Sequence, residues 1–157
     1  MIKVNIVCIG KVKEKYFKDG IDEYKKRLSR YCNFNIVELE EENYSVVSPS
    51  LIDKIKRVEA ERMEKHLKGY LIVTAIEGEQ FSSESLAKTI KSLADTGTGE
   101  ITFVIGGSYG VDDNIKKRAN KLLSVSKMTF PHTLFRLILT EQIYRAFSIN
   151  EGSAYHK

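Results

Sequence analysis

The stretch from Glu100 to Gly110 reads E-I-T-F-V-I-G-G-S-Y-G, and it decides the class of fold. Its first half, Ile101 to Ile105, is β-branched or aromatic at every position, which is typical of a strand buried on both faces. Three glycines follow within five residues, and glycine lets other groups approach the backbone closely. Open α/β sheets bind ligands in loops of this kind, beyond the carboxyl ends of their strands. A tight strand-to-helix turn without a ligand explains this stretch alone equally well.

Strand and helix patterns alternate on both sides of this stretch. Strand patterns cover residues 2–9, 35–39, 70–76, 101–105 and 122–130, and helical patterns cover residues 14–31, 51–67, 82–97, 114–120 and 134–149. The triplet at residues 77–79 is predicted to turn the chain. Such alternation predicts an α/β fold, with a mostly parallel sheet and helices on both of its faces.

Length and composition predict one soluble domain over residues 1–157. Apolar residues make up 42% and charged residues 29%, the usual shares in globular proteins. No apolar run approaches the roughly 20 residues of a membrane helix, and the N-terminus lacks the shape of a signal peptide. Cys8 and Cys32 have no paired histidines nearby and predict neither a zinc site nor a disulfide framework. We therefore expect a cytoplasmic protein without membrane or metal.

The net charge of +4 is unevenly distributed along the chain. Residues 1–30 hold nine Lys/Arg against four Asp/Glu, and residues 111–157 hold eight against four, whereas the middle of the chain is acidic. If the two ends meet in the fold, one face becomes basic and suits nucleic acid. Lys11, Lys13 and Lys15 are the candidates for contacts with RNA phosphates, because they follow the first strand. Scattered solvated charge is the alternative.

The last predicted helix has no clean polar face. Apolar side chains all round a helix indicate burial on more than one side, so we predict a homodimer through this helix. The alternative is a helix that lies centrally within one chain. Glu141 and Arg145 are four residues apart and can pair on one face of the helix. The tail that follows carries the side chains of Tyr155, His156 and Lys157, although a frayed terminus is its ordinary state.

Four motifs of the chain together resemble one known family. They are V-I-G-G-S-Y-G (104–110), S-K-M-T-F-P-H (126–132), E-Q-I-Y-R-A (141–146) and the terminal Y-H-K. The chain is similar, over its whole length, to the RlmH family of ribosomal large-subunit pseudouridine N3-methyltransferases, which belong to the SPOUT, or α/β-knot, class. The resemblance implies a C-terminal trefoil knot, an S-adenosylmethionine cofactor and 23S rRNA of the assembled ribosome as substrate.

The resemblance also implies the residues of the site. The cofactor contacts carried over by position are Thr74, Gly106, Val125, Ser126, Lys127, Met128, Thr129 and Phe130. The candidates for catalysis are Arg145, Tyr155, His156 and His132. In the dimer implied by the resemblance, the tail of one subunit completes the pocket of the other.

Two other functions compete with methyl transfer. The first is a nucleotide-phosphate enzyme that uses the 106–110 loop to hold an anion, but this loop matches neither G-x-G-x-x-G nor a P-loop. The second is a non-catalytic RNA-binding or ribosome assembly factor with the same fold. Binding of S-adenosylmethionine separates the first alternative from a methyltransferase, and methyl transfer to ribosomes separates the second.

Overall fold

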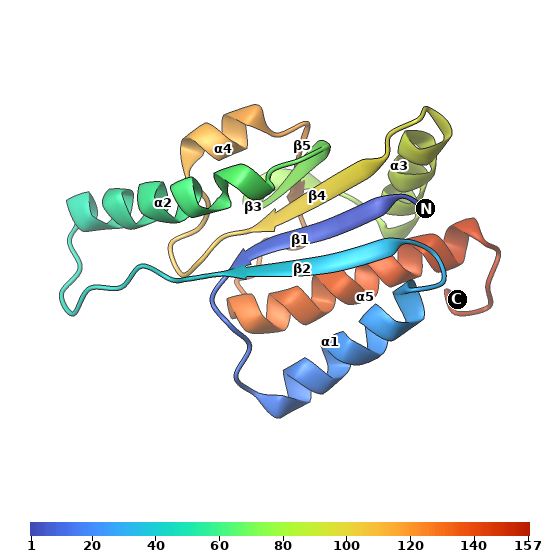
Figure 1. The fold of residues 1–157 in the computed structure, drawn as a ribbon, viewed down its shortest axis with the longest axis horizontal. Helices are drawn as coiled ribbons and strands as arrows, with labels where there is room; N and C mark the ends of the chain where they lie inside the picture. Colours follow the sequence, from blue (N-terminus) through green and yellow to red (C-terminus); the bar gives the residue numbers. More distant parts are fainter.

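Five parallel strands form one sheet in the computed structural model, which describes residues 1–157 (Figure 1). The strands are β1 (Lys3–Ile9), β2 (Asn33–Leu39), β3 (Tyr70–Gln80), β4 (Glu100–Ile105) and β5 (Lys121–Ser124). The helices are α1 (Lys15–Leu28), α2 (Pro49–Met63), α3 (Ser83–Asp95), α4 (Asp113–Arg118) and α5 (His132–Asn150), with a short 3₁₀ helix at Glu64–His66. The predicted α/β fold is confirmed.

The order of the strands is β2-β1-β4-β3-β5, and each neighbouring pair is parallel. Strand β4, which contains the Ile101 to Ile105 run, therefore lies at the centre of the sheet, between β1 and β3. Its residues 101–105 are all buried, as the run of β-branched and aromatic side chains predicts. Since parallel strands all end at the same edge, the glycine loop after β4 lies beside the segments that follow β1 and β3.

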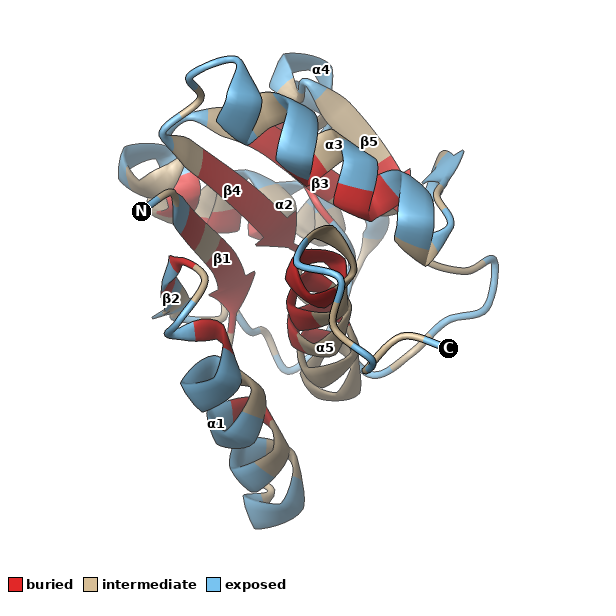
Figure 2. Cartoon of the chain, turned by 90° about the vertical axis from the view of Figure 1, so that its right-hand side faces the viewer, coloured by how far each residue is buried: buried red, intermediate tan, exposed pale blue.

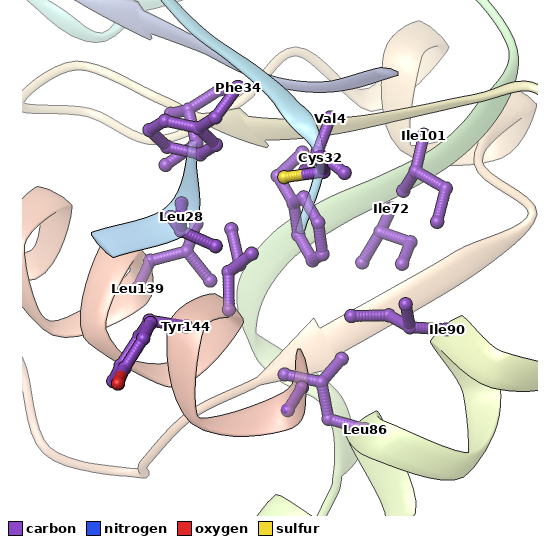
Figure 3. Packing of buried hydrophobic residues seen from close by; sticks show 14 of the residues in the cluster. Val4, Leu28, Cys32, Phe34, Ile72, Leu86, Ile90, Ile101, Leu139 and Tyr144 are labelled. Atoms are coloured by element: carbon purple, nitrogen blue, oxygen red, sulfur yellow. The ribbon is translucent and has the colours of Figure 1, made fainter. Parts of the chain in front are cut away.

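Helices cover both faces of the sheet. Helices α1, α3 and α5 share the larger core with one face, through residues such as Leu28, Leu86 and Ile143. Helices α2 and α4 cover the other face, where Met63 and Ile115 are buried. Figure 3 shows side chains of the larger core meeting between the strands and the three helices. No helix is both long and apolar enough to span a bilayer.

Helix α5 is enclosed by its own chain on three sides. It packs on the sheet and lies between α1 and α3, and none of its residues is exposed (Figure 2). At 100° per residue, the fourth side carries Leu134, Ile138, Glu141 and Arg145, which are half-buried. Much of the burial that suggested a dimer therefore arises within the chain. The homodimer stays a prediction, and only the outward stripe formed by these four residues is left as its interface.

Two segments differ from the sequence-based expectation. The predicted turn at residues 77–79 lies inside β3, which continues to Gln80 past a shift in its register with β5. Gly78 permits this, because a Cβ there would stand 2.7 Å from the carbonyl oxygen of Leu122. The predicted strand 122–130 ends at Ser124, since β3 offers no further partner, and residues 125–131 form a loop. The trefoil knot stays a prediction.

Candidate active site

A cavity of about 780 Å³ opens at the carboxyl edge of the sheet. The ends of β3 and β4, the glycine loop and the loop after β5 form its wall, and 10 of its 21 lining residues are hydrophobic. Its lining includes Ile76, Tyr109 and Met128, which are all exposed, with Met128 reaching 74%. Large apolar side chains beside a concave surface are typical of a site for a small molecule with an apolar part.

The glycine loop forms one wall of this cavity. Gly107 and Gly110 pair in a tight turn, in which the Gly110 amide donates to the Gly107 carbonyl at 3.1 Å. Gly106 is required by this turn, because a Cβ there would stand 2.5 Å from the carbonyl carbon of Gly110. Gly110 has a φ of 87°, and no atom lies within 4 Å of the place where its Cβ would be. The turn is therefore tight and it lines a cavity, and ligand binding by this loop stays a prediction.

The loop of residues 125–131 forms the facing wall. Of the residues named there for cofactor binding, Val125, Ser126, Met128, Thr129 and Phe130 line the cavity, and so do Thr74 and Gly106 on the opposite side. Lys127 does not line it and is exposed. The Thr74 hydroxyl donates to the Val104 carbonyl at 2.8 Å, so this side chain is engaged within the sheet.

The amide groups of this facing loop are largely free. The Met128 amide donates to the Ser126 hydroxyl at 3.0 Å, which bends the loop. The amides of Lys127, Thr129 and Phe130 donate to no group of the protein. Free backbone donors beside apolar side chains suit a flat, nitrogen-rich ring such as adenine.

His132 opens α5 and lines the same cavity. Its ring packs over Gly10, where a Cβ would stand 3.4 Å from its Cε1 atom, and its Nδ1 is buried without a partner. The three lysines predicted to bind RNA follow Gly10 and are exposed. Lys15 is already paired with Asp19 at 2.7 Å, which leaves Lys11 and Lys13 as the unpaired charges of this segment.

The C-terminal tail folds back onto α5 through a polar network. Arg145 donates to Glu141 Oε1 from Nε at 3.0 Å and from Nη2 at 2.6 Å. The Tyr155 hydroxyl donates to the same oxygen at 2.9 Å and contacts the Tyr24 hydroxyl at 3.1 Å. The guanidinium group also lies over the Tyr155 ring, 4.7 Å from its centre. The structure thus brings Arg145 and Tyr155 together, as a shared site requires, and the tail is not frayed.

The protonation of this network follows from its contacts. Arg145 Nη1 lies 3.1 Å from His156 Nδ1, and a guanidinium group only donates, so Nδ1 carries the lone pair. His156 Nε2 therefore bears the proton and donates to Glu84 at 2.8 Å. Burial, together with the hydrogen bonds to Tyr24 and Glu141, raises the pKa of Tyr155 well above its ordinary value. Tyr155 is consequently a phenol at neutral pH and a donor rather than a base.

The tail network and the cavity lie at opposite ends of α5. Thirteen residues separate His132 from Arg145, which corresponds to about 20 Å along a helix. Neither Arg145, Tyr155 nor His156 lines the cavity. Within one chain the catalytic candidates are therefore split, with His132 beside the cavity and the other three remote from it.

Several residues of the site could not be found from the sequence. Glu84 and Tyr24 hold the tail from α3 and α1, and no local pattern relates them to residues 155 and 156. Lys116 of α4 lines the cavity and pairs with Glu77 at 2.7 Å, which lowers the pKa of that carboxyl. Ile76 was detectable, because it ends a strand pattern at the edge where the glycine loop lies. The structure has no group of three or more His, Cys, Asp or Glu side chains that could hold a metal ion.

Comparison with curated proteins finds relatives that match this chain over nearly its whole length. The chain is 51% identical to "Ribosomal RNA large subunit methyltransferase H" of Lactobacillus delbrueckii subsp. bulgaricus, over 99% of this chain and 100% of the relative. The protein of the same name from Streptococcus pyogenes serotype M49 is 50% identical, with the same coverage of both chains.

Solved structures share the fold at low sequence identity. A probable methylase family protein from Haemophilus influenzae superposes with a TM-score of 0.55 at 12% identity, covering 98% of this chain and 70% of that one. The tRNA (m1G37) methyltransferase of Aquifex aeolicus gives 0.50 at 13% identity, covering 92% and 69%. The family model described as "Predicted SPOUT methyltransferase" matches residues 2–156. With relatives at half identity over its full length, the chain belongs to the SPOUT methyltransferase family, among the ribosomal RNA large subunit methyltransferase H proteins.

Proposed function

We propose that this chain is an S-adenosylmethionine-dependent methyltransferase that methylates N3 of a pseudouridine in 23S rRNA of the assembled ribosome. The observation that carries the proposal is the cavity between the glycine loop and residues 125–131, in a chain of this family. The proposal includes a homodimer through α5, a C-terminal trefoil knot and a cytoplasmic location, without a metal ion.

The cavity has the chemistry that S-adenosylmethionine requires. Its volume of about 780 Å³ is within the usual range for small-molecule sites. Met128 and Phe130 supply apolar surface for the adenine ring, and the free amides of Thr129 and Phe130 supply donors for its nitrogen atoms. Gly106 and Val125 form opposite walls. When bound, S-adenosylmethionine supplies an activated methyl group.

The homodimer unites the two halves of the catalytic set. The outward stripe of α5 carries Leu134 and Ile138 near one end and Arg145 near the other. A two-fold axis across this stripe places each end of one α5 against the opposite end of its partner. The tail of each subunit would then lie at the cavity of the other. Within one chain, about 20 Å along α5 separates the tail from the cavity, so a tail cannot reach the cavity of its own chain.

Each tail residue then has a defined role. Arg145, held by Glu141, orients the RNA base and stabilises negative charge on it. His156 Nδ1 carries a lone pair, and we assign it as the acceptor of the N3 proton once it separates from Arg145. Tyr155 lies under the Arg145 guanidinium group and donates one hydrogen bond to Glu141, whereas His132 closes the cavity beside Gly10. Full single-turnover methylation by a His156→Ala variant would refute the assignment of the base.

The exposed lysines after β1 hold the RNA. Lys11 and Lys13 closely follow Gly10, which packs against the His132 ring at the edge of the cavity. We expect a Lys11→Ala, Lys13→Ala double variant to reduce the slope of ribosome affinity against salt by about two, since each phosphate contact releases roughly one counterion. Lys15→Ala should change it least, because Lys15 is paired with Asp19. An unchanged slope in the double variant would remove these lysines from the interface.

Two measurements test the proposal as a whole. Calorimetry should show binding of S-adenosylmethionine, whereas binding of ATP alone would indicate the nucleotide-phosphate enzyme. Methyl transfer to ribosomes from a strain that lacks the modification should occur at one pseudouridine. Ribosome binding without methyl transfer would instead indicate a non-catalytic assembly factor.

Mixed dimers test the shared site. At a cofactor concentration well below the weakened Kd of Gly106→Ala, this cavity variant and the tail variant His156→Ala should each have little activity as homodimers. In a refolded equal mixture half of the dimers are mixed, and each mixed dimer has one intact site, so about one quarter of the wild-type activity should return. If the tail served its own chain, no activity would return.

A further inference from the structure

Arg136 is a buried charge that the proposed chemistry does not use. It lies on α5 one turn after His132 and is 1% exposed. It is the largest fully buried side chain of the protein. Its Nη1 donates to Glu38 Oε2 at 2.6 Å and its Nη2 donates to the Ile9 carbonyl at 3.0 Å. Arg136 is buried, whereas the Glu38 side chain is 35% exposed. Burying a charged side chain is costly, and replacing such pairs by apolar residues is often neutral or stabilising, so stability alone does not explain why Arg136 is charged.

These contacts join α5 to the basic segment after β1. Glu38 Oε2, the oxygen that binds Arg136, also accepts from the amide of Val12 at 3.1 Å. Val12 lies between the exposed Lys11 and Lys13. One carboxylate therefore fixes the backbone of the basic segment to the helix whose first turn lines the cavity.

We propose that Arg136 and Glu38 are positioning residues, which hold Lys11 and Lys13 at a fixed place relative to the cavity. RNA phosphates bound by the two lysines then set where the target base arrives. This inference rests on the proposed function, because it needs the lysines to bind RNA and the cavity to transfer a methyl group. It assigns neither Arg136 nor Glu38 a contact with the substrate.

Whether removal of the Glu38 charge strengthens or weakens ribosome binding distinguishes a positioning role from a purely electrostatic one. Removing the negative charge of Glu38 beside two lysines should strengthen RNA binding if only the local potential matters. If Glu38 positions the segment, its removal should weaken ribosome binding in spite of that gain. Glu40→Ala is the matched control, since Glu40 carries the same charge two residues later and its side chain contacts neither Arg136 nor Val12.

The test measures the KM for unmodified ribosomes and the calorimetric Kd for S-adenosylmethionine in the full-length protein. We expect Glu38→Ala to raise the KM by about tenfold or more, which is about 1.4 kcal/mol, and to leave the cofactor Kd within about twofold of the wild type. Glu38→Gln keeps an acceptor for Val12 and should have a smaller effect, and Glu40→Ala should not raise the KM. Arg136→Met would report the same loss if it folds, but the conclusion depends on the Glu38 variants.

A double-mutant cycle with Lys13→Ala completes the test. If Glu38 acts through the basic segment, Lys13→Ala should weaken ribosome binding less in the Glu38→Ala background than in the wild type. Additive effects, an unchanged KM, or a loss of cofactor affinity in parallel with the KM would each overturn the inference. Failure of the proposed function is distinguishable, because Lys13→Ala would then have no effect in the wild type.

Discussion

Replacement of Gly106 by alanine tests whether the tight turn of the glycine loop is needed for binding at the cavity. A Cβ at residue 106 would stand 2.5 Å from the Gly110 carbonyl carbon, 2.7 Å from its oxygen and 2.8 Å from the Val111 nitrogen. Ordinary contacts of a Cβ atom begin near 3.4 Å, so each of these approaches is too close by more than half an ångström. All three neighbours are backbone atoms, and no side chain can rotate away to make room.

The loop itself must therefore move. Overpacking of this kind costs about 1–3 kcal/mol of unfolding free energy, and opening the turn also disrupts the pairing of Gly107 with Gly110. Because the loop is one wall of the cavity, we expect the affinity for S-adenosylmethionine to fall by at least about tenfold. Urea unfolding measures the first effect and calorimetry measures the second.

Gly99→Ala is the matched control for this substitution. Gly99 also lacks a positive φ, and no atom lies within 4 Å of its Cβ position, so alanine fits there. We expect its unfolding free energy to change by no more than about 0.5–1 kcal/mol, in the stabilising direction, with unchanged cofactor affinity. The reasoning is refuted if Gly106→Ala unfolds at the wild-type urea concentration and binds S-adenosylmethionine normally.

Three further predictions concern ionisable and polar groups. Glu59 is 3% exposed beneath Gly107, and burial raises the pKa of its carboxyl. The folded state then holds this proton more tightly than the unfolded state, so stability falls as the pH rises from the ordinary glutamate pKa of about 4.3 through the raised value. Glu59→Gln should remove this fall in stability with rising pH and should stabilise the protein at pH 7. A variant that is less stable than the wild type at pH 7 would contradict the expected direction of the effect. Burial raises the pKa of Cys8 and Cys32 to about 12, so a thiol reagent at pH 8 should label both only after unfolding, and rapid labelling of the native protein would contradict their burial. Tyr24→Phe removes one hydroxyl contact to the tail and should lower methylation while leaving the cofactor Kd unchanged. Methylation at the wild-type rate would contradict a role for this contact in holding the tail.

Local patterns in the sequence were sufficient for most of the architecture. A run such as Ile101 to Ile105 is apolar at nearly every position, so its composition alone predicted a strand that is covered on both faces. Helical spacing likewise located α1, α2, α3 and α5, because it depends on residues three and four apart. Residues 125–130 were wrongly predicted as part of the last strand, since their composition does not reveal that β3 offers no more partners.

The site shows the same division between local and distant information. The sequence by itself determined the fold class, the glycine loop as a ligand-binding candidate and, through resemblance, the residues of the opposite wall. Only the tertiary structure decided that Glu84 and Tyr24 hold the tail, that Arg136 reaches Glu38 and Val12, and that the tail lies at the far end of α5 from its own cavity. The physical reason is that spacing along the chain encodes which face a side chain occupies, whereas contacts between residues 72 or 98 positions apart are fixed by how the elements pack.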